Sequence, residues 1–295
     1  MKQNTARYNG HVLRGLSWYG GKSAGRHGGA VSWINALLPH RYRQCYIEPY
    51  AGMLGVLLSR PRSQIEIVND LNGRLVNWWL CVRDRTDEFA RKLRYTPHSE
   101  RLFHESLGLL DDPDPLTRAV AFHNIILNSR TYSDPDNLAK SHFAISYSST
   151  GRCDTAGRFV EQIDAIADRL RRVVILERDA TQLLDRVKHR DNVLIYSDPP
   201  YRDAKGSNYA VMDGGDRDTL LELYAAQRGR VAISGYGDEW DALGWERNEF
   251  QTSATMCNTA EGDAPKRTEV LWTNFPAMTR SLLLHSEVNG NGAAH

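Results

Sequence analysis

Residues 45–80 read CYIEPYAGMLGVLLSRPRSQIEIVNDLNGRLVNWWL, and their pattern is that of an α/β sheet. Apolar runs typical of strands (CYIEP and QIEIVND) alternate with runs of helical periodicity (AGMLGVLLS and LNGRLVNWWL). Strands and helices that alternate in this way open a parallel α/β sheet. Ligands bind such sheets beyond the carboxyl ends of the strands, so the functional motifs are expected to meet there.

The same alternation returns later in the chain. VVILERDA, VLIYS, RVAISGYG and EVLWTNF predict further strands, while TQLLDRV and DRDTLLELYAAQ predict helices. Between the two α/β parts lie helical patterns and a polar loop without a βαβ unit. We therefore expect a doubly wound α/β domain formed by residues 1–83 and 172–276, interrupted by an inserted, mainly helical subdomain at 84–171. The tail at 277–295 is rich in Gly, Asn and Ala and is expected to be partly disordered.

The composition narrows the class of protein without naming a partner. Hydrophobic residues make up 41% of the 295 and charged residues 25%, close to an average soluble chain. Thirty-seven Lys and Arg against 36 Asp and Glu exclude a uniformly basic wrapper of nucleic acid but allow a local basic groove. The four cysteines form no C-x-x-C pair, which argues against a zinc knuckle and for reduced thiols. No run is apolar enough to span a membrane and the N-terminus is polar, so we expect a cytoplasmic protein without membrane contact.

Asp198-Pro199-Pro200-Tyr201 follows the predicted strand VLIYS. The two prolines remove two backbone donors and fix φ, so the strand ends abruptly. A carboxylate, a carbonyl and an aromatic ring are thereby presented together, which suits a planar base with an exocyclic amine. Asp198 and the carbonyl of Pro199 can each accept one amine hydrogen, and Tyr201 can stack on the ring. Taken alone, the tetrapeptide is more often a proline-terminated strand with an incidental aspartate.

Gly52 and Gly55 lie in EPYAGMLGV, where the first strand enters its helix. Glycines there let the backbone approach a ligand closely, as a nucleoside-binding turn requires. The dinucleotide fingerprint Gly-x-Gly-x-x-Gly is absent, which argues against a nicotinamide dehydrogenase. Asp70 ends the next strand eighteen residues after Gly52, at a spacing where an acidic group meets a ribose hydroxyl pair. The alternatives are a tight αβ turn at the glycines and, for Asp70, an N-cap of the helix starting near Leu71, and Asp70 could both meet the ribose and cap the helix.

A third motif, Trp18-Tyr19-Gly20-Gly21-Lys22, precedes the first strand and by itself could be a surface turn. The ordered set WYGGK, EPYAGMLGV, VND, a long insert and DPPY resembles the DNA adenine methyltransferases. That is the family of the bacterial GATC methylase and of many phage and restriction-associated enzymes. The resemblance covers most of residues 15–275, including RDATQLL, RVAISGYG and KRTEVLWTN.

The resemblance implies a Rossmann-like methyltransferase fold that binds S-adenosylmethionine, releases S-adenosylhomocysteine and needs no metal. It implies that Asp70 holds the ribose, that Asp179 lies by the cofactor adenine, and that residues 198–201 form the catalytic motif. Many members have a second glycine two residues after the first in the cofactor turn, where this chain has Leu54. Glu48 could bind the methionine ammonium, with a role in helix entry or packing as an equal alternative. The residues expected at the cofactor are Trp18, Lys22, Glu48, Gly52, Gly55, Asp70, Asp179 and Asp198.

The insert is expected to read the target sequence. An adenine inside a duplex must be flipped out to reach such a pocket, and the insert can project beside the mouth where the base enters. Its polar loop carries side chains of the types that contact bases and phosphates, although a solvated loop is an equal alternative for any one of them. These candidates are Asn128, Arg130, Tyr132, Asn137 and Lys140.

We therefore expect site-specific methylation of the exocyclic amine of adenine in double-stranded DNA. Methylation of adenine in RNA is the alternative of the same chemistry, since DPPY reads the base and not its sugar. A catalytically silent DNA-binding relative is the alternative of another class, and the intact Asp198, Tyr201 and Asp70 argue against it. About twenty residues follow Phe275, too few for a nuclease domain, so a restriction nuclease would be a separate polypeptide.

Overall fold

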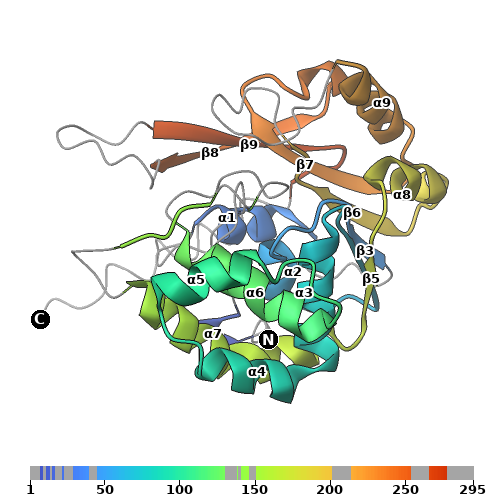
Figure 1. Ribbon diagram of the computed structural model, residues 1–295. Helices are drawn as coiled ribbons and strands as arrows, with labels where there is room; N and C mark the ends of the chain where they lie inside the picture. Colours follow the sequence, from blue (N-terminus) through green and yellow to red (C-terminus); the bar gives the residue numbers. More distant parts are fainter. Residues whose placement is uncertain are drawn as a thin grey trace, which may run out of the picture.

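A seven-stranded sheet forms the centre of the molecule (Figure 1). The computed structural model describes residues 7–8, 11–13, 15–16, 22, 29–39, 45–129, 138, 141–145, 151–200, 214–253 and 266–277. Within them the strand order of the sheet is β5-β4-β3-β6-β7-β9-β8, and β1 and β2 form a separate antiparallel pair. The strands are β1 (Arg7–Tyr8), β2 (His11–Val12), β3 (Cys45–Glu48), β4 (Ile65–Asn69), β5 (Val173–Leu176), β6 (Val193–Ser197), β7 (Arg230–Tyr236), β8 (Glu246–Ser253) and β9 (Lys266–Thr273).

The connections make the sheet doubly wound. From β3 the chain adds β4 and β5 to one side, and then β6 and β7 to the other, with all these neighbours parallel. Only β9 runs antiparallel to its neighbours β7 and β8. The switch in direction lies between β3 and β6, and ligands of such sheets bind outside the carboxyl ends of the strands at that switch. The predicted Rossmann-like methyltransferase fold is therefore confirmed.

Helices cover both faces of the sheet. Tyr46 of β3 belongs to the core beneath α1, α2 and α3, whereas its neighbour Ile47 belongs to the core beneath α8 and α9. This alternation follows from the opposite directions of successive side chains along a strand. Among the described residues, every helix is too short or too polar to cross a bilayer. The bounds are α1 (Ala30–Leu37), α2 (Gly55–Ser59), α3 (Gly73–Asp84), α8 (Ala180–Val187) and α9 (Gly214–Ala225).

In the described part of the stretch predicted to be the insert there are four helices, of which α4, α6 and α7 lie against α3 while α5 packs on α6 (Figure 1). Their apolar side chains, Phe89, Phe103, Phe122 and Phe159 among them, belong to the same core as Trp78 of α3. The described helices of this stretch therefore share the core of α3 and extend the layer of helices on one face of the sheet. The helices are α4 (Thr86–Arg94), α5 (Glu100–Leu107), α6 (Pro115–Asn128) and α7 (Gly151–Leu170).

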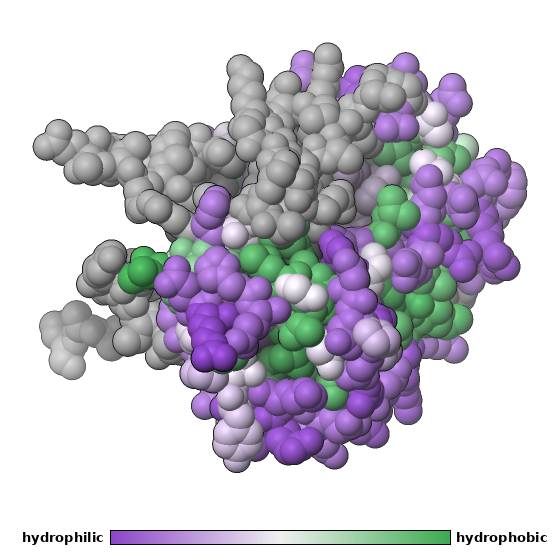
Figure 2. All heavy atoms as spheres, in the orientation of Figure 1, coloured by the Kyte–Doolittle hydropathy of each residue, from purple (hydrophilic) through white to green (hydrophobic). Residues whose placement is uncertain are grey.

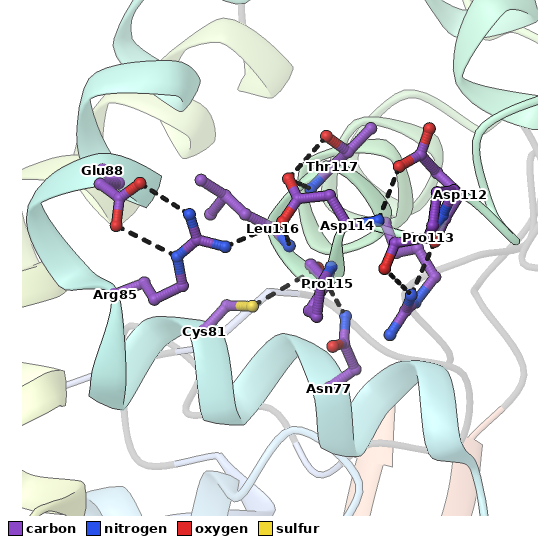
Figure 3. Close-up of polar contacts among 11 residues, drawn as sticks. Asn77, Cys81, Arg85, Glu88, Asp112, Pro113, Asp114, Pro115, Leu116 and Thr117 are labelled. Atoms are coloured by element: carbon purple, nitrogen blue, oxygen red, sulfur yellow. Dashed lines mark hydrogen bonds and ion pairs between the residues drawn. The ribbon is translucent and has the colours of Figure 1, made fainter.

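Polar contacts fix the start of α6 to the end of α3 (Figure 3). Asp114 caps α6 by accepting from the backbone N–H of Thr117 at 3.0 Å, and it also pairs with Arg85 at 2.9 Å. The Thr117 hydroxyl and the Arg85 guanidinium hold the pKa of Asp114 at about 2. Asn77 of α3 donates its amide to the carbonyl of Pro115 at 2.9 Å. These bonds set the direction in which α6 leaves the sheet.

A buried ion pair ties the last insert helix to the sheet. Arg169 of α7 is 1% exposed and donates both terminal nitrogens to the carboxylate of Glu66 in β4, which is 3% exposed. The same guanidinium donates to the carbonyl of Leu57 at 3.1 Å. Because both charges are buried and mutually bonded, neither is left uncompensated.

Candidate active site

Acidic residues gather at the carboxyl edge of the sheet because each follows or ends a parallel strand. Glu48 ends β3, Asp70 follows β4, and Asp198 follows β6. Asp179 comes three residues after β5. Parallel neighbours place these ends side by side, so the sequence motifs meet where the topology predicts a ligand.

Lys22 joins Asp198, at the end of β6, to a second carboxylate. Its Nζ lies 3.1 Å from Oδ1 of Asp198 and 3.0 Å from Oε2 of Glu269, and its side chain is only 4% exposed. Burial alone would lower the pKa of Lys22, but the carboxylates of Asp198 and Glu269 hold that pKa above its ordinary value. Lys22 is therefore a charged ammonium, and it lies beside Asp198.

Glu269 is a site residue that sequence reasoning missed. It lies on β9 directly opposite Tyr236 of β7, whose hydroxyl donates to Oε1 of Glu269 at 2.7 Å. Burial, followed by the Glu269 carboxylate, raises the pKa of Tyr236 to about 12, so this hydroxyl remains a donor at neutral pH. The available signal was an acidic residue at the head of the apolar run EVLWTNF, where a strand would bury it.

Asp198 begins an abrupt turn away from β6. Its side chain is 15% exposed, and the following Pro199 is buried. Beneath it, the hydroxyls of Ser197 and Tyr224 lie 2.5 Å apart and join the end of β6 to α9. This hydrogen bond to α9 thus fixes the strand end that precedes Asp198. Tyr201 of the same motif and Trp18 of WYGGK lie outside the described residues.

Asp70 connects two turns at the carboxyl edge. Its Oδ2 accepts from the backbone N–H of Gly52 at 2.9 Å, and its Oδ1 accepts from the N–H of Asn72 at 2.9 Å. Helix α3 begins at Gly73 and is capped by Asn72, whose Oδ1 accepts from two backbone N–H groups. The alternative role of Asp70 as the N-cap is therefore wrong, because the cap lies two residues later.

The turn after β3, which is expected at the cofactor, uses left-handed backbone at two positions. Gly52 has φ of 49° and Leu54 has φ of 56°, in the region that glycine occupies at little cost. Leu54 stands where many members of the resembling family have glycine, and the left-handed conformation is nevertheless present. Gly55 has a different reason: a Cβ there would lie 2.8 Å from the backbone oxygen of Lys22. At Gly55 it is therefore the backbone of Lys22 that approaches closely.

Glu48 is buried within the sheet's own core layer. It is 2% exposed and accepts from the hydroxyl of Tyr46 at 2.6 Å. Burial raises the pKa of Glu48 to about 7, with the Tyr46 hydroxyl and the nearby Arg60 opposing this shift. These contacts support the packing role, and binding of a methionine ammonium by Glu48 stays a prediction.

Asp179 caps α8, with Oδ1 accepting from the backbone N–H of Thr181 at 2.8 Å and from its hydroxyl at 2.7 Å. The Asp179 side chain is exposed. Burial, followed by the charges of Asp179 and Asp216, raises the pKa of Tyr50. Tyr50, in the EPYAG turn, is a residue of this edge that sequence reasoning did not single out.

Asn128 has a different placement from the one expected of a DNA contact. It is 1% exposed, donates to Oδ1 of Asn124 at 2.6 Å, and its own Oδ1 lies 2.5 Å from Nδ1 of His98. Its amide is used inside the insert, so the expectation that it contacts DNA does not fit this arrangement. Next to it, Ser129 pairs with Phe143 and forms the base of the polar loop. The remaining candidates, Arg130, Tyr132, Asn137 and Lys140, lie outside the described residues.

The chain matches the family model of the D12 class N6 adenine-specific DNA methyltransferases over residues 18–242. No curated protein shows significant sequence similarity to it. Among solved structures it is similar to the rRNA methyltransferase aviRa from Streptomyces viridochromogenes, at 16% identity and a TM-score of 0.38, over 86% of this chain and 88% of that one. A likeness of that degree carries no argument about substrate. In the part of the chain that the structure describes, no cluster of His, Cys, Asp and Glu could hold a metal ion.

Proposed function

Since this chain belongs to the D12 class N6 adenine-specific DNA methyltransferase family, we propose that it moves a methyl group from S-adenosylmethionine to the exocyclic amine of an adenine flipped out of double-stranded DNA. The observation that carries the proposal is the position of Asp198. Its carboxylate lies at the switch of the sheet, on a buried ammonium, at the head of the motif that would receive the base.

The exocyclic amine of adenine is a poor nucleophile because its lone pair is delocalised into the ring. Asp198 and the carbonyl of Pro199 would each accept one amine hydrogen, which turns the lone pair towards the methyl donor. The Asp198 carboxylate would also stabilise the positive charge that develops on the nitrogen as the new bond forms. The methylated nitrogen then loses its proton to water, so Asp198 is not required to remove a proton before the attack.

The residues at the strand ends fit S-adenosylmethionine, which when bound supplies a methyl group on a positively charged sulfur. Asp70 already accepts two backbone N–H groups, and each carboxylate oxygen has a second lone pair for a ribose hydroxyl. Asp179, exposed beside Tyr50, can accept from an adenine amine. The left-handed Gly52 brings backbone without a side chain to the same edge.

Lys22 and Glu269 would set the charge at the methyl-transfer step. One ammonium between two carboxylates leaves a net charge of −1, facing a cationic donor and a nitrogen that becomes positive. The contact with Lys22 would also limit the Asp198 carboxylate to one orientation. We therefore assign Lys22 to positioning Asp198, in addition to its expected place at the cofactor.

Single-turnover methylation of a random-sequence duplex with labelled S-adenosylmethionine tests the proposal. Asp198→Asn keeps the shape of the side chain and removes its charge, and the exposed Asp191→Asn is the matched control. We expect Asp198→Asn to lose at least about tenfold in rate, equivalent to about 1.4 kcal/mol of barrier. If Asp198→Asn loses less than about tenfold in rate, or if the control loses as much as Asp198→Asn, the role of Asp198 is contradicted. Transfer to adenine in RNA but not in the duplex would contradict the assigned substrate.

A further inference from the structure

A groove of about 690 Å³ lies on the face of the sheet that carries α8. Its floor includes Cys45, Ile65 and Val193, the first residues of β3, β4 and β6. Asp198 and the other acidic residues lie at the opposite, carboxyl ends of these strands. The groove runs from these amino ends to Leu176 and Arg178 at the end of β5, and it lies on the face of the sheet that carries α8, not at the switch point beside Asp198.

The floor of the groove is apolar and open to solvent. Ile65 is 50% exposed, and Val174, which pairs with Ile67 of the floor, is 47% exposed. Figure 2 shows hydrophobic surface on the flank where Figure 1 places β3 and β5. Large side chains of this kind are usually buried, and parallel sheets are usually covered on both faces.

The short length of α8 explains why the apolar floor of the groove stays uncovered. The helix has eight residues, and its Leu183, Leu184 and Val187 pack against the side chains of β3 and β6. Over β4 and β5, at the edge of the sheet, no further helix of the described chain lies on this face. The apolar floor over β4 and β5 is therefore a surface on which one more helix could pack, since a helix of about 10 Å diameter packs onto a sheet through its apolar face.

Three arginines, Arg178, Arg186 and Arg190, line the groove. Within the described residues none of them forms an ion pair, and no acidic residue lines the groove with them. The nearby Asp185 and Asp191 already pair with Lys188 and with Arg228. The groove is thus an apolar floor with uncompensated positive charge.

We propose that this groove binds an amphipathic helix of a partner protein whose apolar stripe is flanked by Asp or Glu. The apolar stripe would cover the floor at Ile65 and Ile67, and the carboxylates would pair with the arginines. A nucleic acid would engage the arginines and leave the apolar floor in water. The tail at 278–295 has only one acidic side chain, Glu287, and does not supply the charge.

Two labelled helical peptides of about 16 residues, which span about 24 Å, test the proposal by fluorescence anisotropy with the full-length protein. Both repeat leucine at helical spacing, and the flanking positions carry Glu in one and Lys in the other. Arg186→Glu/Arg190→Glu, the rim variant, reverses the charge of two arginines that line the groove. The matched control Arg158→Glu/Arg171→Glu reverses the charge of two exposed arginines elsewhere. Ile65→Asp places a carboxylate on the apolar floor of the groove. Methylation by the rim variant should equal that of the wild type, which shows that it is folded.

We expect the Glu peptide to bind the wild type at least about tenfold more tightly than the Lys peptide. The rim variant should reverse this preference, Ile65→Asp should weaken the Glu peptide, and the control should behave as the wild type. Equal binding of the two peptides, no binding of the Glu peptide, or an equal loss in the control would overturn the proposal. Self-association that Ile65→Asp abolishes, seen by sedimentation, would assign the groove to a second copy of the chain and would also overturn it.

Discussion

Replacing Glu269 by Gln tests whether the second carboxylate on Lys22 contributes to methyl transfer. The substitution keeps the size of the side chain and an acceptor for the hydroxyl of Tyr236, but it changes the charge of the Asp198, Lys22 and Glu269 group from −1 to 0. If the amine bonds the Asp198 oxygen that Lys22 contacts, the distances from Glu269 through Lys22 and Asp198 to the amine place the lost charge about 9 Å from the reacting nitrogen along this path.

At an effective dielectric constant of about 20, a unit charge at about 9 Å contributes about 2 kcal/mol, and roughly half of that if the nitrogen carries half a charge in the transition state. A loss of about 1 kcal/mol corresponds to about a fivefold slower single turnover. The affinity for S-adenosylmethionine, measured by calorimetry, serves to separate binding from chemistry and should change less than the rate.

The matched control is Glu249→Gln, the same substitution at an exposed position on the neighbouring strand β8. It should leave the rate unchanged. If Glu269→Gln retains the wild-type rate while folded, or if Glu249→Gln loses as much, the charge of Glu269 has no part in the reaction. Lys22 would then position Asp198 without help from β9.

Three further substitutions test other parts of the site. Asp70→Ala should weaken S-adenosylmethionine binding by one or two orders of magnitude, about 1.5–3 kcal/mol, and unchanged affinity by calorimetry would limit Asp70 to holding the N–H groups of Gly52 and Asn72. Because burial raises the folded-state pKa of Glu48 from 4.5 to about 7, Glu48 favours the fold below pH 4.5 and this contribution is lost as pH rises to about 7. Denaturation of wild type and Glu48→Gln should therefore show the variant gaining up to about 3 kcal/mol relative to wild type between about pH 5 and about pH 8, and a pH-independent difference would contradict the buried, raised pKa. Arg130→Ala should cost about 1–3 kcal/mol on the preferred sequence alone if Arg130 reads a base, whereas a uniform loss with a flatter salt dependence would assign it to phosphate.

The order of elements and the acidic strand ends followed from local patterns. The apolar runs of β3, β4 and β6 are short and each is followed by punctuation, Gly52, Asp70 or Pro199, so their carboxyl ends could be placed from the sequence. Parallel order then brings those ends together without any knowledge of side-chain contacts.

Contacts between distant segments could not be predicted in the same way. Lys22 and Glu269 lie near opposite ends of the chain. No local pattern specifies that β9 inserts beside β7 and brings Glu269 to Lys22. The cap of α3 illustrates a smaller ambiguity, since Asp70 and Asn72 are both good capping residues and only the start of the helix selects Asn72. Asn128 was predicted to lie in the polar loop, whereas it is the last residue of α6 and its amide bonds with Asn124 and His98 inside the helical layer.

The Lys22 segment mechanically connects the turn expected at the cofactor to the residue expected at the adenine. Its backbone oxygen lies 2.8 Å from the position that a Cβ of residue 55 would take, while its ammonium lies 3.1 Å from Oδ1 of Asp198. Leu54, beside that contact, adopts a left-handed conformation that costs about 1–2 kcal/mol for a residue with a Cβ, and burial of its side chain, worth about 1.5–3 kcal/mol, offsets this. The glycine is thus required at residue 55 and dispensable at residue 54, because only residue 55 is met by another segment. A movement of the cofactor turn would therefore reach Asp198 through Lys22, which gives a physical reason for one short motif to contact both sites.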